Sequence, residues 1–290
     1  MLIPIGFVIV LASVFGGYVL SGGSLGPLFQ PLELLMIGGA GAGAFVASNH
    51  GKALKSTFRI FSRLRRSNSY NKAMYMELMA LQYRLLSKAR KDGMLSIERD
   101  IDDPSSSPLF NDYPKVLADP MIMNFLTDYL RLMVTGNMDP MEIDELMLHE
   151  IEMFEQEAHM PADAINKVAD AMPAFGIVAA VMGVVKALSS ATADPSEMGE
   201  MIAHALVGTF LGILLGYGFI SPLASRIERQ TNEALKVLQC LRVTLLASLH
   251  GYPPQLAVEF GRKALHSSER PSFSELESHV RDAKSQGGGS

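Results

Sequence analysis

AMPAFGIVAAVMGVVKAL, residues 171–188, and MIAHALVGTFLGILLGYGFI, residues 201–220, decide the fold of this chain. Each stretch is long enough to cross a bilayer, because a spanning helix needs about 20 apolar residues at about 1.5 Å each. Leu2–Leu20 and Leu32–Ser48 have the same character, and the first of them has no ionisable side chain. The sequence therefore predicts an all-α polytopic membrane protein with four transmembrane helices.

The overall composition agrees with a membrane protein and excludes several other classes. Of 290 residues, 48% are hydrophobic and 19% are charged, and the mean hydropathy is +0.19. A chain this apolar is not disordered, and its net charge of -5 argues against nucleic acid as a partner. Cys240 is the single cysteine, so we expect a structural thiol, no internal disulfide and no cysteine metal cluster.

Basic residues between the apolar stretches predict the orientation, because Lys and Arg beside a span remain in the cytoplasm. Residues 187–200, like 21–31, contain no Lys or Arg, whereas residues 49–72 contain seven and no acid. We interpret this basic run as a topology signal that also contacts anionic lipid. Both termini are therefore predicted to be cytoplasmic. No basic segment precedes the first span, so we expect it to be retained and not cleaved as a signal peptide.

These signals divide the chain into spans, loops and cytoplasmic segments. The predicted spans are residues 1–20, 32–48, 171–188 and 201–222, and the predicted periplasmic loops are residues 21–31 and 189–200. A helical cytoplasmic domain is expected at residues 49–170, with cytoplasmic C-terminal helices at residues 223–284. Residues 285–290 end in Gly-Gly-Gly-Ser, have the composition of an appended linker, and are set aside.

Start and stop signals predict helices in the cytoplasmic segments. One apolar stripe at helical spacing predicts a helix to about Lys91, which Gly93 is placed to stop. Its members are Met74, Leu78, Leu81 and Leu85. Asp119 and Asp139 each precede a proline, which is an N-cap signal for two further helices, the first ending near Gly136.

The remaining cytoplasmic segments carry weaker helix signals. Residues 139–170 contain ten acids and one base, which predicts a solvated acidic helix. The fourth span is expected to continue past Pro222 as a long helix to about Leu249. Ser272 with Glu275 fits a capping box, in which each residue accepts a hydrogen bond from the other's amide.

The spans have no ionisable residue at mid-membrane, where such a group usually marks an ion path. Glu33, Lys186 and His204 lie near the outer ends and are interpreted as interface residues. Small residues fill the third and fourth spans instead, and those of the fourth recur every four positions, so another helix can approach closely. They are Gly176, Ala179, Ala180 and Gly183, followed by Gly208, Gly212, Gly216 and Gly218. This face either packs within the chain or surrounds a partner helix that brings its own carboxylate.

Two prolines bracket the small-residue spans at what the topology predicts to be one depth. Pro173 lies at the cytoplasmic start of the third span, and Pro222 lies at the cytoplasmic end of the fourth. Proline removes a backbone donor and loosens a helix locally. The sequence leaves two roles open, a helix start and stop, or a hinge.

Seven short motifs carry a family resemblance. Three lie in the small-residue spans: PAFGIVAAVMG at 173–183, GTFLG at 208–212 and YGFISPL at 217–223. Four are cytoplasmic: KAMYM at 72–76, ERDI at 98–101, VEFGRK at 258–263 and SSERPSF at 267–273. Together they resemble the flagellar motor stator A-subunit family, MotA, of the MotA/TolQ/ExbB proton channels, and the resemblance runs to about residue 284.

The resemblance implies an assembly and a mechanism. Five A subunits would surround two B subunits (MotB), each of which supplies a helix with a protonatable Asp. Ions crossing between A and B would turn the A ring and exert torque on the rotor switch protein FliG. The electrical part of the driving force is worth about 2.3 kcal/mol per charge per 100 mV. The implied location is the bacterial inner membrane at the flagellar motor, with lipid as a further partner and no cofactor besides the coupling proton.

Five residues match positions to which the family assigns a role. Arg90 and Glu98 match the charges that face the rotor, and Glu150 matches a less important charge of the same kind. By resemblance, Pro173 and Pro222 couple protonation of the B carboxylate to movement of the cytoplasmic part. Without the resemblance, charges in a polar stretch are usually a solvated face.

Two residues predict which ion the protein uses. Ala180 shares a face with Gly176 and Gly183, which we expect to meet the partner's helix. Sodium-driven relatives carry threonine at the position of Ala180, where a hydroxyl helps to ligate the cation. Thr209 offers one hydroxyl and proton-driven members share it, so we expect protons to be the coupling ion.

Four other functions compete with the stator. An energiser of outer-membrane import, of the ExbB and TolQ kind, usually has three spans and a smaller cytoplasmic region. A sodium-driven stator shares the fold, and a self-contained transporter would need ionisable groups at mid-membrane. An enzyme is excluded because no nucleophile, metal-spacing or phosphate-loop pattern occurs, and Gly38-Gly39-Ala40-Gly41 lies inside a span.

Overall fold

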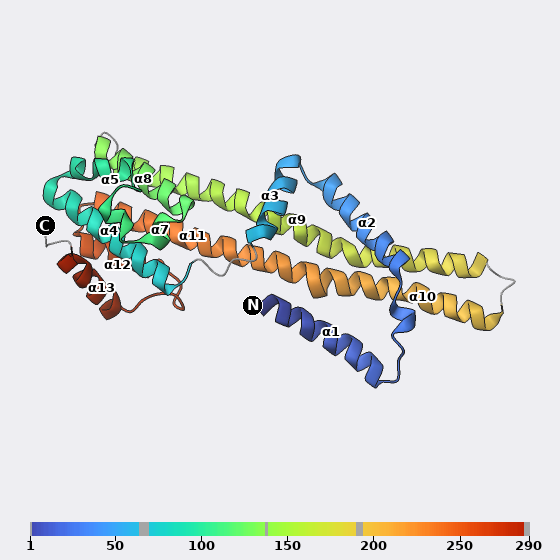
Figure 1. The fold of residues 1–290 in the computed structure, drawn as a ribbon. Helices are drawn as coiled ribbons and strands as arrows, with labels where there is room; N and C mark the ends of the chain where they lie inside the picture. The colour runs from blue at the N-terminus through green and yellow to red at the C-terminus, as the bar shows by residue number, and fades with distance from the viewer. Residues whose placement is uncertain (1, 64–69, 137–138, 190–193, 287–290) are drawn as a thin grey trace. The chain divides into compact units, whose positions relative to one another are not determined.

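The computed structural model describes residues 2–63, 70–136, 139–189 and 194–286, and every element in these ranges is helical (Figure 1). Arg65 and Arg66 of the basic run, residues 190–193 of the loop after the third span and the Gly-Gly-Gly-Ser tail lie outside the described residues. Contacts divide the chain into two compact units. Unit 1 comprises residues 1–65 and 158–229, and unit 2 comprises residues 66–157 and 230–290.

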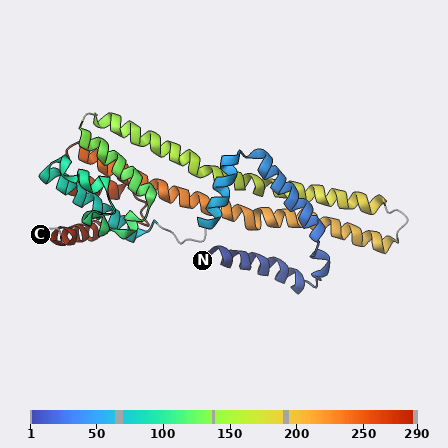
Figure 2. The ribbon, with the colours of Figure 1, turned by 45° about the horizontal axis from the view of Figure 1, so that its top comes forward.

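Unit 1 contains the apolar helices. Its elements are α1 (Leu2–Leu20), η1 (Gly26–Leu28), α2 (Pro31–Ser48), α3 (Gly51–Arg63), the second part of α9 (Pro140–Ser189), α10 (Pro195–Ile213), η3 (Leu214–Ile220) and the start of α11 (Ser221–Leu249). Among the described residues, four helical segments are long and apolar enough to cross a membrane, and each contains one of the four predicted stretches. α9 and α10 run side by side in both ribbon views (Figures 1 and 2).

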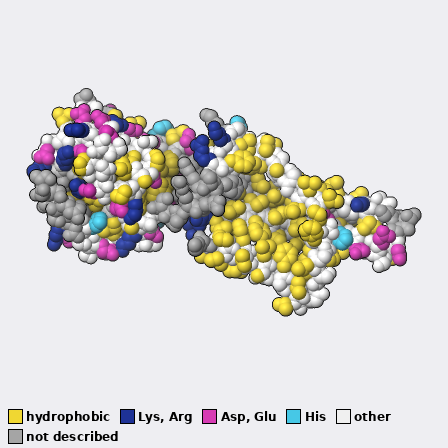
Figure 3. Space-filling model, in the orientation of Figure 1, with side chains coloured by type: hydrophobic (Ala, Val, Ile, Leu, Met, Phe, Trp, Pro, Cys, Tyr) yellow, Lys and Arg dark blue, Asp and Glu magenta, His cyan; other side chains and the backbone are white. Residues whose placement is uncertain are grey.

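The surface of unit 1 has the character expected of helices in lipid. α1 buries none of its residues, and its apolar side chains point outward. Figure 3 shows a broad hydrophobic surface over α1 and α2, with acidic side chains gathered toward the hairpin end of α9 and α10. Apolar patches of this extent are rare on soluble monomers, so this surface favours a membrane environment.

Unit 2 packs short helices around α4. Its elements are α4 (Lys72–Asp92), η2 (Met94–Ile97), α5 (Glu98–Asp102), α6 (Pro108–Asn111), α7 (Pro114–Leu117), α8 (Pro120–Thr135), the first part of α9, the rest of α11, α12 (Pro254–Lys263) and α13 (Phe273–Gln286). The predicted stripe on α4 is buried in its core, which confirms the helical spacing. Cys240 is fully buried there, and burial raises the pKa of its thiol to about 12, as expected of a structural thiol.

The predicted helix ends in unit 2 are confirmed. Asp119 accepts hydrogen bonds from the amides at the start of α8, and that helix ends at Gly136, whose φ is 69°. α4 ends before Gly93, whose φ of 88° favours glycine. Ser272 and Glu275 form the expected capping box, with backbone-to-side-chain bonds of 2.7 and 3.2 Å.

Pro173 and Pro222 both lie within continuous helical segments, so neither begins or ends a helix. α9 continues for 50 residues through Pro161 and Pro173, so Pro173 does not begin a helix. Pro222 does not stop one, because η3 leads directly into α11, which reaches Leu249 as predicted. η3 is a π-helix in which the Ser221 amide donates to the Gly216 carbonyl. A widened turn relieves the clash between a proline ring and the carbonyl four residues before it, which explains its place beside Pro222.

Candidate functional site

The small residues of α9 and α10 bring these two helices into backbone contact. A Cβ placed on Gly212 would lie 2.6 Å from the carbonyl oxygen of Met172 and 2.9 Å from the Cα of Gly176. A Cβ on Gly176 would lie 2.7 Å from the carbonyl oxygen of Gly208. Any side chain at these positions would force the helices apart. The small residues therefore pack α10 closely on α9 within this chain.

Ala180 lies on that internal contact and not on a free face. A Cβ on Gly208 would lie 3.1 Å from the Ala179 methyl and 3.2 Å from the Ala180 amide, and Ala180 is 7% exposed. Thr209 is half-buried, with its Cα 3.3 Å from the Cβ position of Gly176. Within this chain, α10 packs on the face of α9 that carries Ala180.

The face of α9 that remains open is apolar and β-branched. Its exposed side chains are Ile177, Val178, Val181, Met182, Val185 and Leu188. This face was not predicted from the sequence, because the small residues on the opposite side of the helix form the more conspicuous pattern. The signal was present, since Ile177, Val181 and Val185 recur every four residues.

Pro173 contacts the π-helical segment that leads to Pro222. A Cβ on Gly216 of η3 would lie 3.3 Å from the Pro173 Cδ. On another side, Phe219 of η3 stacks on Phe7 of α1, with ring centroids 4.9 Å apart. Both prolines that the sequence indicated therefore adjoin one element, η3: Pro173 contacts it, and Pro222 follows it in the first turn of α11. η3 itself is packed between α1 and α9.

Arg90 and Glu98 lie on either side of a tight corner in unit 2, and both are exposed. Arg90 is in the last turn of α4, with its Nη1 3.4 Å from the Gly251 carbonyl, and Glu98 is the first residue of α5. An ion pair of 2.7 Å between Lys88 Nζ and Asp100 Oδ2 ties α5 to α4. This pair holds the two predicted rotor-facing charges on one surface.

Glu150 is exposed on α9 but is not free. Its Oε2 accepts a hydrogen bond of 2.7 Å from the Tyr129 hydroxyl of α8. Burial of the phenol, together with this bond and the negative charge of Glu150, raises the pKa of Tyr129. Part of the role of Glu150 is therefore to hold α9 on α8.

Glu33 is buried, so the interpretation of this residue as an interface group, alongside Lys186 and His204, is wrong. Only 8% of Glu33 is exposed, and with Ile37 and Gly41 it forms the buried face of α2, which packs against α10. Its Oε2 is buried and has no hydrogen-bond partner among the described residues. His204 lies half-buried on α10. The sequence did contain a signal for this burial, because Glu33, Ile37 and Gly41 recur at every fourth position and so share one face of the helix.

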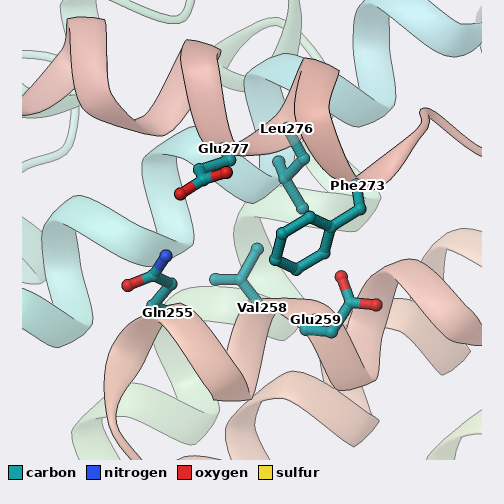
Figure 4. A pocket seen from close by; sticks show the side chains of 6 residues that line it. All are labelled: Gln255, Val258, Glu259, Phe273, Leu276 and Glu277. Atoms are coloured by element: carbon teal, nitrogen blue, oxygen red, sulfur yellow. The ribbon is translucent and has the colours of Figure 1, made fainter.

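A small hollow between α12 and α13 is packing and not a binding site. In Figure 4, Phe273 and Leu276 of α13 point toward Val258 of α12. Arg262 of α12 donates to the carboxylate of Glu259 at 2.6 Å and to the backbone carbonyl of Pro271 at 2.8 Å. Within the described ranges, no group of three or more His, Cys, Asp or Glu residues could hold a metal ion.

Comparisons with known families match most of the chain. Residues 4–93 match the model described as Motility protein A N-terminal, and residues 118–239 match the MotA/TolQ/ExbB proton channel family. The Motility protein A of Salmonella typhimurium is 57% identical over 281 residues, which cover 97% of this chain and 95% of that protein. The Motility protein A of Escherichia coli is 56% identical and covers 98% of this chain and 96% of its own length.

Two solved structures share the fold. The C. jejuni MotAB structure aligns with a TM-score of 0.77 at 20% identity, over 93% of this chain and 98% of that one. The flagellar MotAB stator complex from Bacillus subtilis aligns with a TM-score of 0.76 at 25% identity, with the same coverage of both chains.

Proposed function

This chain belongs to the motility protein A family of the MotA/TolQ/ExbB proton channels, and we propose that it is the flagellar stator subunit that converts the proton-motive force into torque on FliG. As a stator subunit of a channel family, it is a component of an ion channel and not an enzyme. The observation that supports the proposal most strongly is the near full-length similarity to motility proteins.

The proposed assembly places five copies around two B subunits in the inner membrane, with both termini in the cytoplasm. Two solved neighbours are MotAB complexes, which supports a MotB partner for this chain. The centres of the spans have no carboxylate of their own, so the partner's Asp would carry the proton. The open apolar face of α9 is the surface we assign to the partner's helix, because the glycine face is occupied by α10.

Protons are the proposed coupling ion. A sodium ion would have to exchange most of its water for protein oxygens, and uncompensated desolvation costs several kcal/mol. The open face of α9 supplies no side-chain oxygen, Ala180 behind it supplies none, and Thr209 of α10 supplies a single hydroxyl. A proton needs no ligand cage, because it neutralises the partner's carboxylate. The alternative of a sodium-driven stator would require further oxygen ligands from the partner.

The proposed rotor contact is the exposed corner that carries Arg90 and Glu98, with Glu150 as a weaker contributor. Exposed charges are screened over about 8–10 Å at physiological salt, so neutralising one of them should be mild. Reversing either Arg90 or Glu98 should weaken swimming while membrane assembly stays intact. The opposite reversal on the rotor partner should recover part of the loss. Unchanged motility after reversal at both positions would show that the corner does not contact the rotor.

Copurification tests the assembly, and swimming speed tests the ion. The chain should copurify with its B partner as a complex whose image shows a ring, and a monomer without partner would overturn the proposal. Swimming speed in complemented cells should be indifferent to external sodium and should collapse with a protonophore. A speed that follows sodium at fixed pH and potential would instead indicate the sodium-driven alternative. Restoration of outer-membrane import without motility would indicate an ExbB-like or TolQ-like energiser.

A further inference from the structure

Glu33 is a buried carboxylate whose presence the packing of unit 1 does not explain. It occupies the first turn of α2, 8% exposed, on the face that packs against α10. An oxygen buried without a partner costs free energy, and the cost is greater for a charged group. A carboxylate that only held α2 on α10 would use both oxygens in hydrogen bonds, yet Oε2 has no partner among the described residues.

His204 is the group that can compensate this carboxylate. It is half-buried on α10, one of the helices against which the buried face of α2 that carries Glu33 packs. Four further charged residues of the described chain lie toward this end, and all four are exposed: Lys186 of α9, Asp194 directly before α10, and Glu197 and Glu200 of α10. Imidazole takes up and releases protons near neutral pH, so His204 can exchange a proton with a buried carboxylate on the neighbouring helix, directly or through water.

We propose that Glu33 and His204 form a proton-binding site at the outer ends of α2 and α10, through which protons enter the conduction path. This site rests on the proposed function as a proton channel and adds to it an entry point within this chain. Intramembrane ionisable residues usually line ion pathways, and they usually have a partner for their charge. The pair lies at the ends of the spans, so it would serve proton access and leave the central step to the partner's carboxylate.

The transfer is balanced at every step. A hydronium ion on the outside gives a proton to the imidazole of His204, so one O–H bond breaks, one N–H bond forms and a water molecule is left. The imidazolium then passes the proton to Oε2 of Glu33, which breaks the N–H bond and forms an O–H bond. Glu33 releases the proton inward and returns to the carboxylate, and His204 returns to neutral imidazole. No oxidant or reductant is needed.

The test is the pH profile of proton influx into cells or vesicles that contain the whole stator complex. Glu33→Gln keeps the shape of the side chain and removes its ability to accept a proton, so influx should fall several-fold and lose its dependence on external pH. His204→Gln should do the same, and the double variant should be no worse than either single one. Glu33→Asp should restore part of the wild-type profile. Glu200→Gln, the same change at an exposed acid of α10, is the matched control and should leave the profile unchanged.

A wild-type profile in Glu33→Gln would overturn the proposal, because a purely structural role predicts that result. Copurification with the partner shows whether each variant assembles. If Glu33→Gln does not assemble, then His204→Gln and Glu33→Asp decide, and wild-type profiles in both would also overturn it. Failure of the proton channel itself would appear differently, as an absence of proton influx in the unaltered complex.

Discussion

A methyl group at Gly212 tests whether the α9–α10 contact is as close as the structure describes. In Gly212→Ala the new Cβ would lie 2.6 Å from the Met172 carbonyl oxygen and 2.9 Å from the Gly176 Cα. Optimal contacts between carbon atoms are about 3.5–4.0 Å, and both neighbours are backbone atoms that cannot rotate away. The two helices must therefore separate along this contact, which would also loosen the contacts of Thr209 and Ala180.

The expected loss follows from two opposing effects. Overpacking a close contact typically costs about 1–3 kcal/mol. Replacing a helical glycine by alanine returns about 0.5–1 kcal/mol, because alanine loses less conformational entropy. We therefore expect Gly212→Ala to lower the free energy of unfolding by about 1–2 kcal/mol. Gly38→Ala in α2 is the matched control, since nothing lies within 4 Å of its Cβ position, and only the gain should remain.

Thermal unfolding of the purified complex in one detergent, with Gly212→Ala and Gly38→Ala side by side, measures the difference. Gly212→Ala should unfold at a lower temperature than the wild-type protein, and Gly38→Ala should unfold at the same or a higher temperature. Swimming should follow the same order. Equal stability of the two variants would refute the close backbone contact between α9 and α10.

Three further predictions concern the hinge and unit 2. Replacing Pro173 or Pro222 with Ala should stiffen η3 and abolish torque at near-normal expression and partner binding, and full motility in both variants would contradict the hinge. Gln82 is 1% exposed with both amide atoms unpaired in the described part of the chain, so Gln82→Met should raise the free energy of unfolding by about 1–3 kcal/mol in thermal melts; no rise would argue against it. Hydrogen bonds from Lys72 and the Ser272 backbone lower the pKa of Glu275 to about 2, so its contribution is complete above its ordinary pKa of 4.5 and is lost as pH falls from there toward 2. The protection of α13 amides against hydrogen exchange, relative to the intrinsic exchange rate at each pH, should therefore fall over that pH range, and Glu275→Gln should remove this loss.

Local signals in the sequence predicted the parts of the fold that depend on neighbours along the chain. Asp119 caps α8 through amides two and three residues away, and Gly93 ends α4 through its own φ. The four apolar stretches follow from length and composition, and they are confirmed as helices that long. The chain order of helices in unit 2 was therefore predictable, while their mutual packing was not, since it depends on contacts between distant segments.

The sequence could not predict which helix each face in unit 1 contacts. Small residues and carboxylates indicate the kind of contact a face makes, but they do not identify the helix on the other side. Gly208 and Gly212 predicted a close helix, and the structure supplies α9 of the same chain. Glu33 had the position of an interface residue, and only the packing of α2 on α10 buries it.

Once α10 covers the glycine face, the surface of α9 left for a partner is the apolar one around Ile177 and Val181, which has no polar side chain of its own. The side chains of α9 on that surface offer no ligand to an ion and only exclude water from it. Excluding water lowers the local dielectric constant, which strengthens the electrostatic interactions nearby. The polar groups that handle the proton must then come from the partner's helix and from the ends of the spans, where Glu33 and His204 lie.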